Sequence, residues 1–270
     1  MRARKLLICC AVPLLAGCLF ARKVVTLPAD DALVRDQLVI HSDFRLPRHH
    51  RLVEELAARR NDVVERLRLP ASDEPIHVYL FDTSERFQAF VARHHPDFPD
   101  RRAFFLEGDT QLDVYAYWGD RVAEDLRHEV THGYLHTMVP HLPLWIDEGL
   151  AEYFEVPRSQ GGLNPPHLAM LLQAAQQRNW TPDLQRLEQL ATPGEMTQQD
   201  YAEAWAWVHF LLDSHPQRSE LLRSHLARIR MTGTAPPLSQ VLVAAEPQAP
   251  QRLREHLQTL DRTSTTKPSQ

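Results

Sequence analysis

The sequence predicts an α+β fold, in which a small β-sheet with helices on it precedes a mainly helical half. Three observations favour this order. Short runs with alternating apolar residues, typical of half-buried strands, fall before residue 120. After residue 120 the apolar residues recur every three or four positions, which is helical spacing. The chain has 270 residues, of which 43% are hydrophobic and 24% charged, so it can bury a sizeable core.

The first half is expected to contain four strands and two helices. In chain order they span 37–44 (strand), 48–69 (helix), 76–81 (strand), 83–93 (helix), 103–106 (strand) and 112–117 (strand). The first helix ends before Pro70, and Thr83 or Ser84 can cap the start of the second. Glu107-Gly108-Asp109 is typical of a turn, which separates the last two strands.

The second half is expected to be almost wholly helical. The predicted helices span 120–139, 145–155, 165–178, 183–190, 198–214, 217–231 and 250–260. Asp120 can cap the first of them. Pro165-Pro166 and Pro236-Pro237 mark breaks between helical stretches, because proline cannot continue a helix from within.

Residues 1–17 have the layout of a secretory signal peptide. Basic residues at positions 2, 4 and 5 precede an apolar stretch over 6–16, which is shorter than the roughly 20 residues of a membrane-spanning helix. Leu15-Ala16-Gly17-Cys18 follows directly, and the whole segment resembles a bacterial lipoprotein signal. The resemblance implies cleavage before Cys18 and lipidation of its thiol. An ordinary signal peptide with an incidental cysteine is the alternative.

The lipoprotein resemblance also implies a location in the cell envelope. Leu19, in place of an aspartate after the cysteine, implies the outer membrane of a Gram-negative source, facing the periplasm. The protein would then contact the membrane through the lipid anchor at Cys18, with residues 18–35 as a tether. Cleavage would leave Cys18 as the one cysteine of the mature chain, so we expect no internal disulfide.

The net charge argues against nucleic acid as a partner. The formal charge is −5 at pH 7, so the chain lacks the basic field that gathers phosphates. We therefore expect no nucleic-acid partner. The sequence leaves the oligomeric state open.

An HExxH motif, His128-Glu129-Val130-Thr131-His132, lies in the predicted helix over 120–139. Residues four apart on a helix are separated by only about 40° around its axis, so both imidazoles project from one face. They can therefore bind a single Zn²⁺. Glu129 lies beside the remaining coordination position, where a carboxylate can take a proton from water as general base. The motif predicts a zinc-dependent hydrolase.

A third ligand comes from a resemblance in the segment LWIDEGLAEYF over 144–154. An HExxH helix followed by W-x-x-E-G-L-A-E-Y resembles the gluzincin branch of the zincin-like metallopeptidases, and is most similar to its peptidase MA-like families. In aminopeptidase-like members the glutamate before the glycine binds zinc, which implies Glu148 here. Fifteen residues separate His132 from Glu148, fewer than in the best-known gluzincins, whose spacing would select Glu152 instead.

The same resemblance, which covers roughly residues 75–215, implies two further roles. Glu152 would accept the free N–H of His128 and so orient that ligand; the alternative is an exposed helix charge. Tyr201 would donate a hydrogen bond to the oxyanion of the reaction; the alternative is an amphipathic tyrosine at a helix start. We expect His136 to face solvent or to support the ligands indirectly, and Asp147 to be a helix-start charge.

The sequence thus predicts a gluzincin-type zinc metallopeptidase that acts on peptides or proteins. A lipid-anchored binding or envelope assembly factor, which keeps the fold without turnover, is the rival from another class. A cell-wall hydrolase shares the chemistry and differs in substrate. The zincin-like domain is expected over residues 36–260, with a sheet-containing part over 36–119 and a helical part with the metal site over 120–260. The polar tail 261–270 is expected to be disordered.

Overall fold

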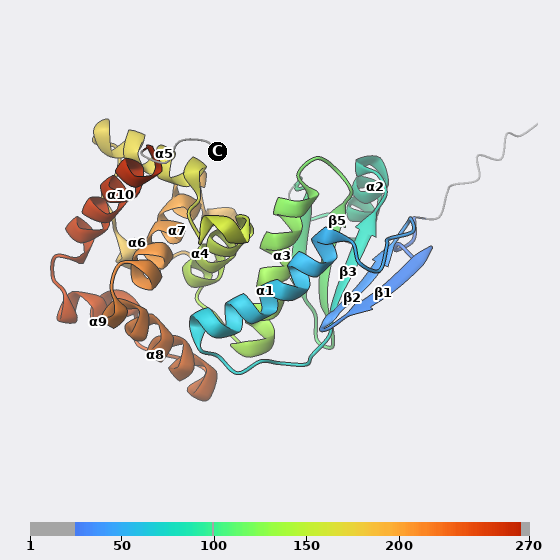
Figure 1. Cartoon of the computed structure of the whole chain (residues 1–270), viewed down its shortest axis with the longest axis horizontal. Coiled ribbons are helices and arrows are strands. Elements are labelled where there is room, and N and C mark those ends of the chain that lie inside the picture. The colour runs from blue at the N-terminus through green and yellow to red at the C-terminus, as the bar shows by residue number, and fades with distance from the viewer. Residues whose placement is uncertain (1–24, 99, 266–270) are drawn as a thin grey trace, which may run out of the picture.

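The computed structural model describes residues 25–98 and 100–265 of the chain. A five-stranded sheet with helices forms the N-terminal half and the remainder is mainly helical, which confirms the predicted α+β order (Figure 1). The predicted signal peptide, Cys18 and the first part of the predicted tether lie outside the described residues. The described helices include none with both the length and the apolar character that crossing a bilayer requires.

Five strands form one sheet. They are β1 (Asp31–Arg35), β2 (Leu38–Ser42), β3 (Ile76–Phe81), β4 (Ala103–Glu107) and β5 (Leu112–Tyr117). Their order in the sheet is β1-β2-β3-β5-β4. The central strands β2, β3 and β5 run parallel, and the edge strands β1 and β4 are antiparallel to their neighbours. The last four strands are those predicted.

Strand β1 corrects the prediction that residues 18–35 are a tether. None of its side chains is buried and Val34 is 68% exposed, so the strand carries no apolar alternation that the sequence could reveal. It is held by backbone pairing with β2, which follows a turn where Asp36 adopts a φ of 50°. A strand at the edge of a sheet needs only one partner, and its outer face stays in water.

The helices follow the predicted series closely. Among the described residues the α-helices are α1 (Arg51–Leu67), α2 (Ser84–His94), α3 (Val122–Met138), α4 (Leu144–Glu155), α5 (Pro165–Gln176), α6 (Leu184–Leu187), α7 (Gln198–Asp213), α8 (Pro216–Thr232), α9 (Leu238–Ala245) and α10 (Ala249–Thr265). Two short 3₁₀ turns, η1 (Arg158–Gln160) and η2 (Pro193–Glu195), join them.

The helices differ from the predictions in several details. The predicted helix over 183–190 is reduced to the four residues of α6. Helix α9 was not predicted, because eight residues are too few for a helical repeat to stand out. Helix α10 continues to Thr265, so residues 261–265 are not part of a disordered tail. Asp120 does not cap α3, whose first flanking residue is Arg121, with no side-chain cap bond.

Helices cover both faces of the sheet, α1 and α3 on one side and α2 on the other (Figure 1). The alternation of β3 serves both layers. Ile76 and Val78 belong to the main core with α1 and α3, whereas Phe81 belongs to a smaller aromatic core with α2. Because α3 is pressed against the sheet, one of its faces is left for the helical half of the molecule.

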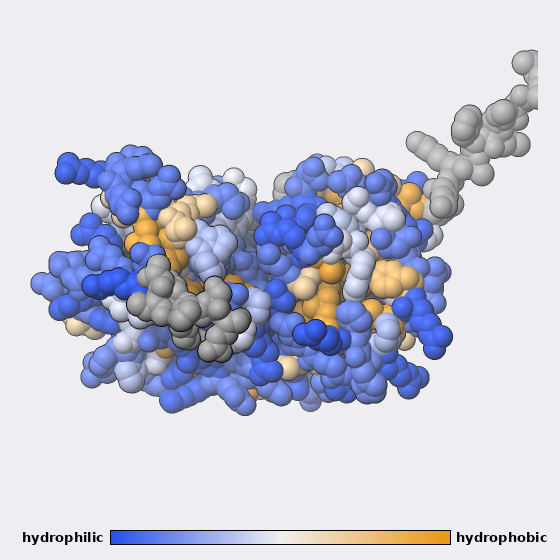
Figure 2. Space-filling model, turned by 45° about the horizontal axis from the view of Figure 1, so that its top comes forward, coloured by the Kyte–Doolittle hydropathy of each residue, from blue (hydrophilic) through white to orange (hydrophobic). Residues whose placement is uncertain are grey.

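Helix α7 is the centre of the helical half, and every residue from 200 to 212 is buried. Helix α4 packs closely against it. A Cβ on Gly149 would lie 2.6 Å from the Ala204 carbonyl oxygen, so only glycine allows this approach. Around these helices the surface is largely hydrophilic, with small apolar patches on both halves of the molecule in the view of Figure 2.

Candidate metal centre

Helices α3 and α4 bring two imidazoles and one carboxylate together. The Nε2 atoms of His128 and His132, one turn apart on α3, lie 3.2 Å from each other. Glu148 of α4 places its Oε2 atom 3.5 Å from the first and 3.6 Å from the second. The three predicted ligands therefore form a compact triangle, and Glu152, the alternative third ligand, is not part of it.

The triangle has the dimensions of a zinc site. Four ligands at roughly 2.0–2.2 Å from a tetrahedral Zn²⁺ are separated from one another by roughly 3.3–3.6 Å. The three measured separations lie at or close to this range. Glu148 Oε2 is buried, and no hydrogen-bond partner for it exists among the described residues. A buried carboxylate oxygen without a hydrogen bond is costly, and a cation at the centre of the triangle would satisfy it.

Local packing explains why these side chains meet. Leu126, Val130 and Tyr134 bury the opposite face of α3 in the core, which turns the two histidines toward α4. The chain then reverses over a few residues, with His141 at a φ of 58°, and α4 begins at Leu144. Because Gly149 allows α4 to approach α7, Glu148 is held inside the molecule facing α3.

The electrostatics of the triangle favour a positive charge. Burial alone would lower the pKa of His132, but Asp147 and Glu148 raise it to about 10. Burial alone would raise the pKa of Glu148, but the two imidazoles lower it to about 2. The pKa of His128 likewise lies well above its usual value, against the effect of burial, because of Glu148 and Glu155. The carboxylates around the triangle therefore stabilise positive charge at its centre, which is the charge that a divalent cation would bring.

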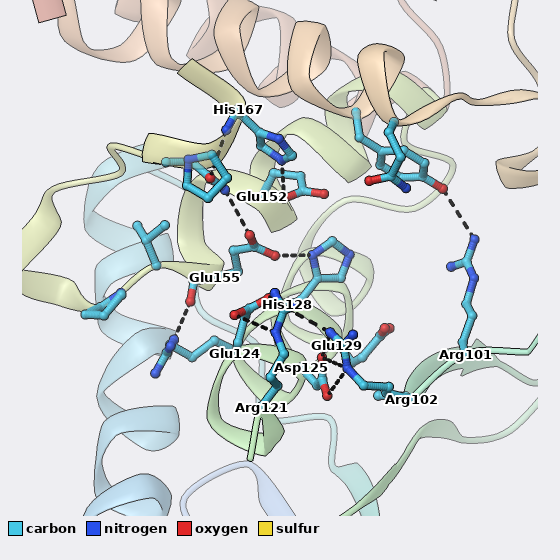
Figure 3. Close-up of a pocket in the computed structure, with 18 of the residues that line it drawn as sticks. Arg101, Arg102, Arg121, Glu124, Asp125, His128, Glu129, Glu152, Glu155 and His167 are labelled. Carbon is cyan, nitrogen blue, oxygen red and sulfur yellow. Dashed lines mark hydrogen bonds and ion pairs between the residues drawn. The ribbon is translucent and has the colours of Figure 1, made fainter. Parts of the chain in front are cut away.

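Glu155, not Glu152, contacts His128, a predicted metal ligand, which corrects the predicted contact of Glu152. The Nδ1 atom of His128 lies 3.1 Å from Glu155 Oε2, and Asn164 Nδ2 donates to the other oxygen of Glu155 at 2.9 Å (Figure 3). Glu152 instead accepts from His167 Nε2 at 2.7 Å. Glu155 lies seven residues after Glu148 and so shares its helical face, a spacing that the sequence contains but that the resemblance did not single out.

A second chain of contacts supports His132 from the other side. Its Nδ1 atom lies 2.9 Å from Asp147 Oδ1, and the other oxygen of Asp147 lies 3.0 Å from His136 Nε2. His136 in turn lies 2.7 Å from Glu107 at the end of β4. Asp147 is therefore more than a helix-start charge, and His136 supports the site indirectly, one of its two predicted roles. Such partners fix the tautomer of a ligand histidine.

A cleft of about 900 Å³ opens in front of the triangle, and His128, Glu129 and Tyr201 all line it. Glu129 is only 9% exposed. Its pKa is raised by burial, although the nearby imidazoles of His128 and His132 lower it in part. Tyr201 enters from the first turn of α7, so the structure brings the two predicted catalytic residues to one cavity.

The cleft also contains a residue that the sequence did not single out. Arg101 precedes β4, and its Nη2 donates to the hydroxyl oxygen of Tyr201 at 3.3 Å, the dashed line at the right of Figure 3. The two residues are one hundred positions apart, and Arg101 stands in no motif. Only the tertiary structure places it beside the site.

Comparison with known proteins finds one family. Residues 123–239 match a family described as "Protein of unknown function (DUF1570)". The match covers less than half of the 270 residues, and it includes the whole triangle and Tyr201. No curated protein matches the chain. The similarity is therefore concentrated in the segment that carries the candidate site.

Proposed function

We propose that this protein is a zinc-dependent peptidase in which His128, His132 and Glu148 hold the metal. One observation carries the proposal: three ligand atoms lie at zinc spacing, the carboxylate oxygen among them is buried without a hydrogen bond, and His128 lines a cleft that also contains Glu129. The HExxH and W-x-x-E-G sequences, which resemble gluzincins, support the same reaction class.

The residues of the chain divide the chemistry among them. A bound Zn²⁺ would lower the pKa of a coordinated water and polarise the scissile carbonyl. Glu129 takes the proton of the attacking water and passes it to the leaving amine. Its raised pKa makes its carboxylate a stronger base than an exposed glutamate. Tyr201 receives its hydrogen bond from Arg101 on the oxygen, so its own O–H is free to donate to the developing oxyanion.

The lipoprotein-like N-terminal segment supports a cellular location for this activity. A lipid anchor at Cys18 would hold the enzyme at the outer membrane, facing the periplasm. Its substrates would then be the peptide bonds of envelope proteins or the peptides of the cell wall. Both contain the same scissile group, and the chemistry of the site applies equally to each.

The decisive experiment replaces Glu129 by Gln and measures zinc content and peptide cleavage together. Glutamine keeps the shape of the side chain and cannot take a proton, so we expect one equivalent of zinc and a loss of cleavage by about 10²–10⁴-fold. Glu124→Gln is the matched control, because Glu124 lines the same cleft but pairs with Arg121. That variant should cleave like the parent.

Two outcomes would count against the proposal. If Glu129→Gln cleaved as fast as the parent, Glu129 would not be the base. If the parent held zinc but cut nothing in a peptide library, the chain would be a zincin-fold binding or envelope assembly factor without turnover.

A further inference from the structure

We propose that Arg101 binds a carboxylate of the substrate, so that the enzyme selects peptides bearing a negative charge near the scissile bond. The inference rests on the proposed peptidase function and adds the substrate class to it. The carboxylate can belong to an acidic side chain or to the C-terminus of the peptide. Two observations support the inference: Arg101 lies in the cleft, and the other arginines of the cleft form ion pairs with carboxylates of the protein.

Four arginines line the cleft, and three of them are neutralised within the protein. Arg102 bonds to both oxygens of Asp125, with its Nη2 2.6 Å from Oδ1. Arg121 pairs with Glu124. Arg127 lies 3.3 Å from Glu55 and also donates to the backbone carbonyl of Glu155.

Arg101 differs from these three. Among the described residues no carboxylate forms an ion pair with it, and its one hydrogen bond goes to the neutral hydroxyl of Tyr201. In Figure 3 it rises along the right of the cleft, apart from the Arg102–Asp125 and Arg121–Glu124 pairs. A guanidinium has five N–H donors in a planar fork, and four of them remain for a ligand.

The position of Arg101 relates it to the reacting group. Tyr201 and Arg101 share a hydrogen bond, so a substrate whose carbonyl meets Tyr201 passes directly beside the guanidinium. Although burial alone would lower the pKa of Arg101, the contact with Tyr201 raises it. Glu148 and Glu129 raise this pKa further, so the guanidinium is within electrostatic reach of the metal centre.

The rest of the cleft makes this position selective. Its other lining groups include the carboxylates of Glu129, Glu152 and Glu155, which repel a second negative charge. A substrate carboxylate is therefore favoured at Arg101 and disfavoured beside these three glutamates. Bidentate guanidinium–carboxylate pairing adds orientation as well as affinity, which is how a single arginine can select a substrate.

Two pairs of synthetic peptides test the proposal and separate the two carboxylate sources. The first pair has amidated C-termini and carries either Glu or Gln at successive positions around the cleaved bond. The second pair has no acidic side chain and ends in a free carboxylate or an amide. We expect the parent enzyme to prefer the carboxylate peptide in one pair by roughly 10- to 100-fold in kcat/KM, as for a charge-assisted hydrogen bond.

The variants Arg101→Met and Arg101→Glu should bring this ratio to about one and below one, respectively. Because Arg101 contacts Tyr201, absolute rates will change for all peptides, and the ratio cancels that effect. Arg102→Met is the matched control: it removes a neighbouring arginine of the same cleft whose charge is already paired with Asp125. It should keep the parent ratio. A parent ratio within twofold of one, or an unchanged ratio in Arg101→Met, would overturn the proposal.

A binding measurement distinguishes failure of this inference from failure of the proposed function. The zinc-loaded Glu129→Gln protein is titrated with the same peptides, with and without Arg101→Met. If the parent cleaves no peptide, the peptidase function fails, and the ratio of dissociation constants still decides whether Arg101 binds the carboxylate. If the parent cleaves peptides and neither ratio depends on Arg101, the function stands and the inference is wrong.

Discussion

Two pairs of histidines in this molecule have similar distances between their ring nitrogens and opposite shifts in pKa. The Nε2 atoms of His128 and His132, both on α3, are 3.2 Å apart. His209 Nδ1 of α7 and His256 Nε2 of α10 are 3.0 Å apart. In the first pair both pKa values are raised, whereas burial and mutual repulsion lower the pKa of His256 to about 4. Burial also lowers the pKa of His209.

The difference comes from the carboxylates around each pair. The first pair is surrounded by Glu148, Asp147 and Glu155. Near the second, the carboxylate of Asp213 lies 3.9 Å from His209, and the aromatic rings of Trp205 and Phe210 contact His209 and His256, respectively. The two pairs therefore differ in the buried negative charge around them, and we expect a cation only at the first. Buried negative charge aimed at the same point is the distinguishing feature.

The largest expected effect is on zinc binding by the two pairs. His132→Ala removes a ligand, and zinc binding energies of roughly 10–16 kcal/mol are shared among about four ligands. We therefore expect zinc affinity to fall by about two to three orders of magnitude. His256→Ala should leave one equivalent of zinc in place. Metal content by mass spectrometry after gel filtration measures both, and stoichiometric zinc in His132→Ala would break the comparison.

A smaller effect is expected when one supporting carboxylate is removed. Glu155→Gln keeps the size of the side chain but weakens the bond to His128 Nδ1, so we expect a loss of roughly 10–100-fold in zinc affinity. Glu152→Gln alters the contact with His167 instead and should cost much less. Competition titration with a chelator gives the two affinities. If Glu152→Gln lost more zinc affinity than Glu155→Gln, the sequence-based role of Glu152 would be restored.

The smallest expected effect concerns stability in acid. His256 titrates at about 4 in the folded protein and near 6.5 when unfolded, so the unfolded chain binds more protons between these values. The contribution of His256 to the free energy of unfolding is fully present above pH 6.5 and is lost as the pH falls towards 4. Because His256 is partly exposed, we expect a loss on the order of 1 kcal/mol between pH 7.5 and pH 5.

Urea unfolding of the parent and of His256→Gln at the two pH values isolates this contribution. Glutamine remains polar and does not titrate, so the variant should lose about 1 kcal/mol less than the parent over the same interval. Titrating groups away from His256 act equally in both proteins and cancel in the difference; His209, 3.0 Å from His256, is the exception. Equal losses of unfolding free energy in the two proteins would show that protonation of His256 does not destabilise the folded protein.

Much of the fold could be predicted because its signals are local. The alternation of β3 and β5 and the helical spacing of α3 and α7 are properties of short segments. Strand β1 escaped prediction because its stability comes from a partner strand rather than from its own apolar residues. Helix α9 escaped because it is only eight residues long.

The sequence by itself determined that His128 and His132 lie one turn apart on the same face of a helix, with Glu129 beside them, because residues four apart on a helix project in nearly the same direction. Only the tertiary structure decided which carboxylates meet those histidines. Glu148, Glu152 and Glu155 share one face of α4, whose approach to α7 is allowed by Gly149. In the folded chain Glu148 meets the two histidines, Glu155 meets His128 Nδ1, and Glu152 meets His167. Arg101 reaches Tyr201 across one hundred residues of chain, a contact made by packing and recorded in no local pattern.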